Sequence, residues 1–122
     1  MAADAEREKA ATPEDIPRLF RKFVAADDYG GLATLYEPGA ILALPAGEVT
    51  RGNHAIAEVF RRVLAERPPG GSEGQLQPVL YCGDLALTST RLSDGRVTAE
   101  VARRQADGSW RWVIDQPNVT SK

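Results

Sequence analysis

The sequence predicts an α+β fold in which helices cover one face of a mostly antiparallel sheet. Two segments in the first half of the chain repeat apolar residues at helical spacing, and from residue 75 onward alternating runs are separated by turn residues. Helices followed by consecutive strands are typical of α+β domains. At 122 residues the chain is long enough for one domain with its own core.

The chain is expected to divide into a flexible leader (residues 1–11), a single domain (12–117) and a loose tail (118–122). The leader is rich in alanine and charge and has no apolar face. Thr12 as N-cap and Pro13 at the first helical position begin the first helix, which the acids and glycines of residues 27–31 end. This helix buries one stripe, made of Ile16, Leu19, Phe20, Phe23 and Val24.

Two further helices are expected, a short one over Leu32–Tyr36 and a longer one from His54 to about Glu66. Pro38 ends the short helix, because a proline disfavours helical geometry in the residue before it. A strand over Ala40–Leu44 lies between the two helices. Four strands follow, over residues 75–81, 85–92, 96–105 and 109–116.

The last two strands are expected to pair through a two-residue type I′ turn at Asp107-Gly108. This turn sets Glu100 directly opposite Asp115, and Arg103 opposite Trp112. Period-2 alternation then gives the hairpin two faces. One carries Glu100, Ala102, Val113 and Asp115, and the other carries Trp110 and Trp112.

The opposed carboxylates are the strongest candidate site, because like charges directly opposite destabilise a sheet. If Glu100 and Asp115 face a pocket, burial and proximity raise one pKa and leave a protonated acid beside an ionised base. The alternative is structural. Each carboxylate would pair with an arginine (Arg91, Arg104 or Arg111), or Asp115 would cap a turn.

The tryptophan face predicts a homodimer interface through Trp110 and Trp112, because exposed apolar patches usually mark contacts. The alternative is an aromatic wall for a ligand, which requires the sheet to be turned the other way round.

Composition excludes several classes of function. A net charge of −2 leaves no basic surplus for nucleic acid, and no apolar run reaches the length of a membrane helix. One His and one Cys make a zinc site implausible, and the lone Cys82 fits the reducing cytoplasm. The polar leader does not resemble a signal peptide, so we expect a cytoplasmic protein.

Three stretches carry a family resemblance: Leu35 to Ala40 (LYEPGA), Arg51-Gly52 before the third helix, and Arg103 to Pro117. Together they resemble the nuclear transport factor 2-like superfamily, in particular its small bacterial SnoaL-like and ketosteroid-isomerase-like members. The resemblance spans residues 13–117. It implies a curved, mixed or antiparallel sheet wrapped around three helices, a cystatin-like cone with an apolar pocket. Such proteins are often dimers through the outer face of the sheet.

Ketosteroid isomerase, within this superfamily, implies roles for single positions. The acid of its oxyanion hole corresponds to Glu100. Its catalytic base, just before a proline, corresponds to Leu44, and its helix-one tyrosine falls near Phe20 or Phe23. Both of these functional groups are therefore absent at the matching positions.

Limonene epoxide hydrolase implies a second set of roles. Its Arg-x-Asp pair corresponds to Arg91 and Ser93, and its second carboxylate corresponds to Asp115. Neither mechanism is present as a whole.

The resulting hypothesis is a pocket protein for a small apolar or polycyclic molecule, in secondary or xenobiotic metabolism. Glu100 and Asp115 would serve a cofactor-independent isomerase, cyclase or hydratase by acid-base chemistry, with no metal. Ligand contacts are expected from Tyr36, Leu44, Arg91, Ala102 and Val113. The alternative is a non-catalytic ligand-binding or dimeric accessory protein of the same fold, so the sequence leaves open whether it is an enzyme.

Overall fold

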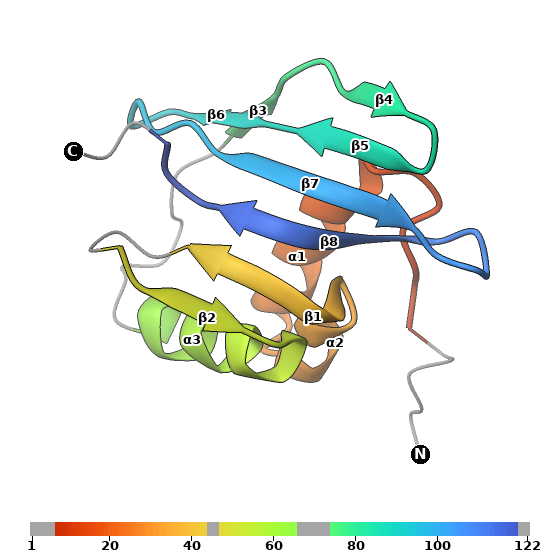
Figure 1. Cartoon of the computed structure of the whole chain (residues 1–122). Helices are drawn as coiled ribbons and strands as arrows, with labels where there is room; N and C mark the ends of the chain where they lie inside the picture. Colours follow the sequence, from red (N-terminus) through yellow and green to blue (C-terminus); the bar gives the residue numbers. More distant parts are fainter. Residues whose placement is uncertain (1–6, 44–46, 66–73, 120–122) are drawn as a thin grey trace.

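The structure, a computed structural model, describes residues 7–43, 47–65 and 74–119. Three helices, α1 (Asp15–Ala25), α2 (Tyr29–Ala33) and α3 (Asn53–Ala65), lie on one side of a six-stranded sheet (Figure 1). The strand order is β2-β1-β8-β7-β5-β4, and β3 and β6 form a separate pair. The strands are β1 (Tyr36–Ala43), β2 (Val49–Arg51), β3 (Gly74–Leu76), β4 (Leu80–Cys82), β5 (Leu85–Thr88), β6 (Thr90–Leu92), β7 (Ala99–Arg104) and β8 (Trp110–Gln116).

The expected α+β class is confirmed, and the sheet is mixed. The strands β1 and β8 pair in parallel, whereas the other neighbours in the sheet are antiparallel. The parallel pair joins the first strand of the chain to the last, so residues far apart in sequence meet at the centre of the sheet.

The short helix and the first strand are displaced from their expected positions. The helix α2 ends at Ala33, and Tyr36 begins β1 instead of closing a helix. Asp28 caps α2 by accepting a hydrogen bond from the Gly31 amide, an N-cap that the sequence pattern did not single out. Pro38 lies within β1, where the register against β8 is irregular between Tyr36 and Ile41. A proline is tolerated there because an irregular ladder does not require its missing N–H.

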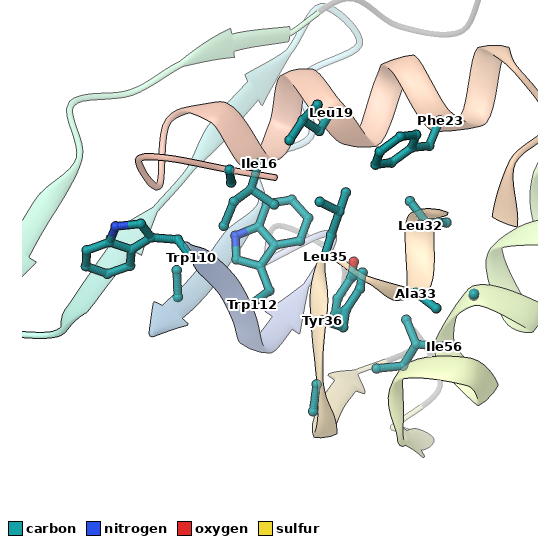
Figure 2. Packing of buried hydrophobic residues seen from close by; sticks show 14 of the residues in the cluster. Ile16, Leu19, Phe23, Leu32, Ala33, Leu35, Tyr36, Ile56, Trp110 and Trp112 are labelled. Atoms are coloured by element: carbon teal, nitrogen blue, oxygen red, sulfur yellow. The ribbon is translucent and has the colours of Figure 1, made fainter. Parts of the chain in front are cut away.

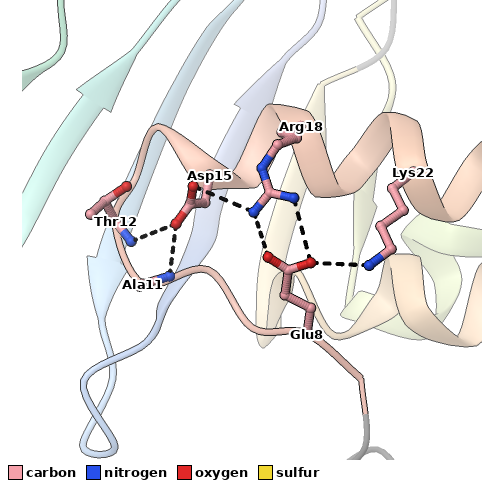
Figure 3. Close-up of polar contacts among 6 residues, drawn as sticks. All are labelled: Glu8, Ala11, Thr12, Asp15, Arg18 and Lys22. Carbon is pink, nitrogen blue, oxygen red and sulfur yellow. Dashed lines mark hydrogen bonds and ion pairs between the residues drawn. The ribbon is translucent and has the colours of Figure 1, made fainter.

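Residues 7–11, which belong to the expected flexible leader, are docked against the domain. Ala10 is 1% exposed, and its carbonyl accepts the Trp110 amide at 2.9 Å. Glu8 accepts hydrogen bonds from Arg18 at 2.5 Å and Lys22 at 3.0 Å on α1 (Figure 3). These partners are distant in sequence, so no local pattern indicates them.

The start of α1 also differs from the expected Thr12 cap. The helix begins at Asp15, whose carboxylate accepts the amides of Ala11 and Thr12 (Figure 3). The chain entering the helix is therefore held by an acid inside its first turn.

The last hairpin has a three-residue loop and a bulge in place of a simple two-residue turn. The Gln105 amide donates to the Ser109 carbonyl at 2.7 Å, and Gly108 takes a φ of 87°. This loop moves the pairing by one residue, so that Ala102, not Arg103, faces Trp112. The register then shifts back between Val101 and Ala102, leaving Val113 unpaired, and Glu100 faces Asp115 as predicted.

The bulge places both tryptophans in the core, so the prediction of a tryptophan dimer face is wrong. Trp110 is 7% exposed and Trp112 is 4% exposed. Figure 2 shows the Trp112 ring under α1, near Ile16 and Tyr36. One extra residue in a strand inverts the alternation, so Trp110 and Trp112 point inward with Asp115.

The outer face of the sheet instead carries an apolar row that crosses five strands. Successive cross-strand partners are Leu80, Leu87, Val101, Ile114 and Ile41. Leu80, Leu87 and Ile114 are exposed at 63%, 42% and 47%. A row of this kind is a candidate contact surface.

Candidate functional site

Glu100 and Asp115 lie inside the protein, on the face of the sheet that packs against the helices. They occupy directly paired positions on β7 and β8 and are 5% and 3% exposed. Burial at paired positions makes both carboxyl groups share one small, poorly hydrated space, where two negative charges are unfavourable.

Each of the two carboxyl groups is held by its own hydrogen bonds. The Tyr36 hydroxyl donates to Asp115 Oδ2, and the Thr88 hydroxyl donates to Glu100 Oε1 at 2.6 Å. The indole Nε1 of Trp112 donates to the Thr88 oxygen at 3.3 Å. Four strands, β1, β5, β7 and β8, therefore contribute two sets of hydrogen bonds inside an apolar core, one at each carboxyl group.

Burial and mutual repulsion separate the protonation of the two acids. Burial and the negative charge of Glu100 together raise the pKa of Asp115 to about 8, although the Tyr36 hydrogen bond lowers it. Burial also raises the pKa of Glu100, against hydrogen bonds from Thr88 and Thr98. At neutral pH Asp115 therefore keeps its proton. A protonated acid beside an ionised one is the arrangement that proton transfer needs.

The structural alternative of arginine pairing does not hold in the described part of the chain. Arg104 binds Asp84 at 2.9 Å, Arg111 donates to the Tyr36 carbonyl at 3.3 Å, and Arg91 is exposed on β6. Asp115 caps no turn, since its recorded donor is the hydroxyl of Tyr36 in a neighbouring strand.

Four aromatic rings form a closed loop beside the carboxyl pair. Phe20 on α1 and Phe60 on α3 have ring centroids 5.1 Å apart, and Tyr36 and Trp112 have centroids 5.5 Å apart. Phe60 meets Tyr36 at 6.5 Å and Phe20 meets Trp112 at 6.2 Å, which closes the loop. Tyr36 and Trp112 are buried, whereas Phe20 and Phe60 are half-buried, so the loop reaches from the core toward the surface.

The residues expected to contact a ligand are not all brought together. Tyr36 bonds to Asp115, and Ala102 is fully buried on the inner face. Val113, expected beside them, is the unpaired bulge residue and only half-buried. Arg91 is exposed in the separate β3–β6 pair, away from the inner face of the main sheet, and Leu44 lies outside the described residues.

Sequence reasoning gave too little weight to Thr88 and misplaced Trp112. The alternation of the segment LALT could have indicated Thr88. Ala86 and Thr88 alternate with the exposed Leu85 and Leu87 on β5, and this places the Thr88 hydroxyl on the inner face. The position of Trp112 depends on the bulge, for which the alternating pattern gives no signal.

Other features of the described residues lie elsewhere. A cavity of about 170 Å³ sits between the docked leader and the start of β8, lined by residues such as Lys9, Thr34 and Arg111, and includes neither carboxylate. In the described ranges no three His, Cys, Asp or Glu side chains gather in a metal-binding group. Nor is any helix of these ranges long and apolar enough to cross a membrane.

Comparisons with known proteins identify the fold. No family model matches the sequence, and no curated protein matches it. A proposed calcium/calmodulin-dependent protein kinase type II association domain from Thiobacillus denitrificans is 19% identical, with a TM-score of 0.68 over 91% of this chain and 98% of the other.

Two further solved structures are similar at the same level. A proposed ketosteroid isomerase from Shewanella frigidimarina is 14% identical, with a TM-score of 0.64 over 84% of this chain and 90% of its own. A SnoaL-like protein of unknown function from Burkholderia thailandensis is 19% identical, with a TM-score of 0.59 over the same shares.

The chain therefore has the nuclear transport factor 2-like, or cystatin-like, fold, which is the fold that the sequence resemblance implied. Identities below 20% show the fold alone, and this fold serves proteins of unrelated activities. Function must accordingly be argued from the carboxyl pair and its surroundings.

Proposed function

We propose that this protein binds a small, largely apolar molecule at the carboxyl pair and catalyses proton transfer on it without a cofactor. Asp115 is the acid and Glu100 is the base. The observation that carries the proposal is the pair itself, two directly opposed carboxyl groups buried in an apolar core with no cation bonded to either in the described residues. Such an arrangement destabilises the folded protein, and destabilising arrangements of charged groups cluster at functional sites.

The step that fits this geometry is an enolisation. Glu100 takes a proton from carbon next to a carbonyl, while Asp115 donates its proton to the carbonyl oxygen, giving a neutral enol. Return of a proton from Glu100 to another carbon, with proton return to Asp115, gives the isomer. Tyr36 keeps the Asp115 carboxyl oriented through its hydrogen bond. Isomerases that move a double bond beside a carbonyl use such a step.

The alternative is a ligand-binding or accessory protein that performs no chemistry. It is favoured by Leu44, which stands where ketosteroid isomerase has its base, and by the hydrogen bonds that already hold both carboxyl groups. Both proposals need a ligand, and only the first needs the proton transfer.

A ligand screen followed by an exchange assay separates them. Thermal shift with a library of apolar ketones and polycyclic compounds is run on the wild type, Glu100→Gln, Asp115→Asn and the surface control Glu58→Gln. Hits are then incubated in deuterium oxide, and NMR measures deuterium entering the carbon beside the carbonyl. Incorporation that both site variants abolish, and the control retains, supports the enzyme. Binding that depends on the pair without incorporation supports the accessory protein, and hits that bind all four proteins equally refute the site.

We also propose that the protein is a homodimer through the outer apolar row instead of the tryptophans. Leu80, Leu87 and Ile114 are exposed on one face, where packing two sheets together would bury them. Light scattering should give a dimer that Leu87→Glu converts to a monomer, with Val49→Glu, an exposed residue on β2, as the control. A wild-type monomer at micromolar concentration would end this proposal.

The proposed setting is the cytoplasm. Cys82 is an exposed free thiol, and reducing conditions keep such a group from oxidising.

A further inference from the structure

Neither carboxyl group of the pair has a cationic partner among the described residues. Glu100 accepts a hydrogen bond from a neutral hydroxyl, that of Thr88, and is 5% exposed. The arginines of β7, the strand that carries Glu100, are bound elsewhere, Arg103 to Glu37 and Arg104 to Asp84. A buried carboxylate normally has a cationic partner, because solvation by neutral groups replaces only part of what water provides.

The aromatic loop has the chemistry to hold such a cation. Each carboxyl group is linked to a different ring of the loop, Asp115 to Tyr36 directly and Glu100 to Trp112 through Thr88. The faces of aromatic rings attract ammonium groups, and tryptophan and tyrosine do so more strongly than phenylalanine. The two stronger rings are the buried ones, next to the carboxyl groups.

The other two rings suit an apolar body. Phe20 and Phe60 are half-buried, come from α1 and α3, and meet edge to face at 5.1 Å. They extend the loop from the buried pair toward solvent, so a ligand that approaches the carboxyl groups from this side meets these two contacting rings first. An aromatic or polycyclic frame gains most from that contact.

We infer that the ligand of this site is an organic cation, a protonated amine carried on an aromatic or polycyclic frame. The ammonium group pairs with the Glu100 carboxylate against the Tyr36 and Trp112 rings, and the frame lies against Phe20 and Phe60. This inference rests on the proposed binding site. A Glu100 carboxylate paired with an ammonium group cannot take a proton from carbon, so the inference deepens the ligand-binding alternative and not the enolisation.

The test uses three probes of one shape and different charge: 2-naphthylmethylamine, 2-naphthylmethanol and 2-naphthoate. Calorimetry at pH 7 gives their affinities, and the Trp112 indole N–H signal in nitrogen-15 spectra reports whether binding occurs at the site. We expect the amine to bind at least about tenfold more tightly than the alcohol, and the naphthoate most weakly. In Glu100→Gln the amine and alcohol should differ by less than about threefold, while the surface control Glu58→Gln keeps the preference.

Added salt distinguishes binding of the amine at the buried site from its weak attraction to the surface of an acidic protein. The preference for the amine should persist at 0.5 M sodium chloride, because buried pairs are screened far less than exposed ones. Circular dichroism checks that Glu100→Gln is folded, and Phe60→Leu gives a second variant that should weaken all three probes.

Several outcomes would overturn the inference. The inference is wrong if the alcohol or the naphthoate binds the wild type as tightly as the amine does. It is also wrong if Glu100→Gln still binds the amine more tightly than the alcohol. If the alcohol binds in a manner that Glu100→Gln and Asp115→Asn both change, the cation is wrong but the site stands. If no probe moves the Trp112 signal, both the inference and the proposed site are refuted.

Discussion

Replacing Asp115 with asparagine should stabilise the protein at neutral and alkaline pH. The side chain is 3% exposed, and burial with repulsion from Glu100 raises its pKa from 3.8 to about 8. Below pH 3.8 the carboxyl is protonated in both the folded and the unfolded state, so its raised pKa has no effect on stability. As pH rises from there to about 8, the unfolded state releases a proton that the folded state retains, so the free energy of unfolding falls.

The magnitude follows from the size of this difference. Each pKa unit corresponds to ~1.4 kcal/mol, so raising the pKa from 3.8 to about 8 removes up to roughly 6 kcal/mol of stability. Asparagine has nearly the same shape, cannot ionise, and can still accept the Tyr36 hydrogen bond. Allowing for an imperfect fit of its amide group, we expect Asp115→Asn to gain at least ~2 kcal/mol over the wild type at pH 8.

The assay is urea unfolding of both proteins at intervals from pH 4 to pH 9. The gain should shrink toward zero near pH 4 and level off above pH 8, while Asp84→Asn, an exposed control on the β4–β5 turn, should show no comparable trend. Equal stability of Asp115→Asn and the wild type at pH 8, or a difference that does not change with pH, would refute the reasoning about the pair.

Three further expectations follow from the same geometry. Tyr36→Phe should lower stability by about 1–2 kcal/mol and raise the pKa of Asp115, because the lost hydrogen bond favours the ionised carboxylate; carboxyl titration by NMR that finds the pKa unchanged would contradict the bond. Trp110 and Trp112 should emit at short wavelength and resist quenching by acrylamide, since both are buried; ready quenching of both would restore the outer-face placement. Ala10→Glu should cost more than ~2 kcal/mol in urea unfolding, because the position is 1% exposed, and a neutral result would mean that the leader is not docked.

The pairing of Glu100 with Asp115 was predicted correctly, but partly because two differences between the predicted and the observed register cancel. The type I′ turn at Asp107-Gly108 predicts Glu100 opposite Asp115, and the structure has that pairing. It arises from a three-residue loop that moves the register by one position and a bulge at Val113 that moves it back. Between the loop and the bulge, the predicted register differs from the observed one by one residue. Trp110 and Trp112 lie in this part of β8, so they are on the inner face and not on the outer face as predicted.

The sequence by itself determined the α+β class, the helical stripes and the candidate pair, because these depend on spacing of 3.6 and 2 residues along one segment. The docking of the leader, the partner of Tyr36 and the face of Trp112 were decided only by tertiary structure. Tyr36 meets Asp115 because the first strand lies beside the last, and nothing local in either strand specifies that contact. A bulge is likewise chosen by how well the inner face packs, so a one-residue change in register, invisible in the pattern, moved two tryptophans into the core.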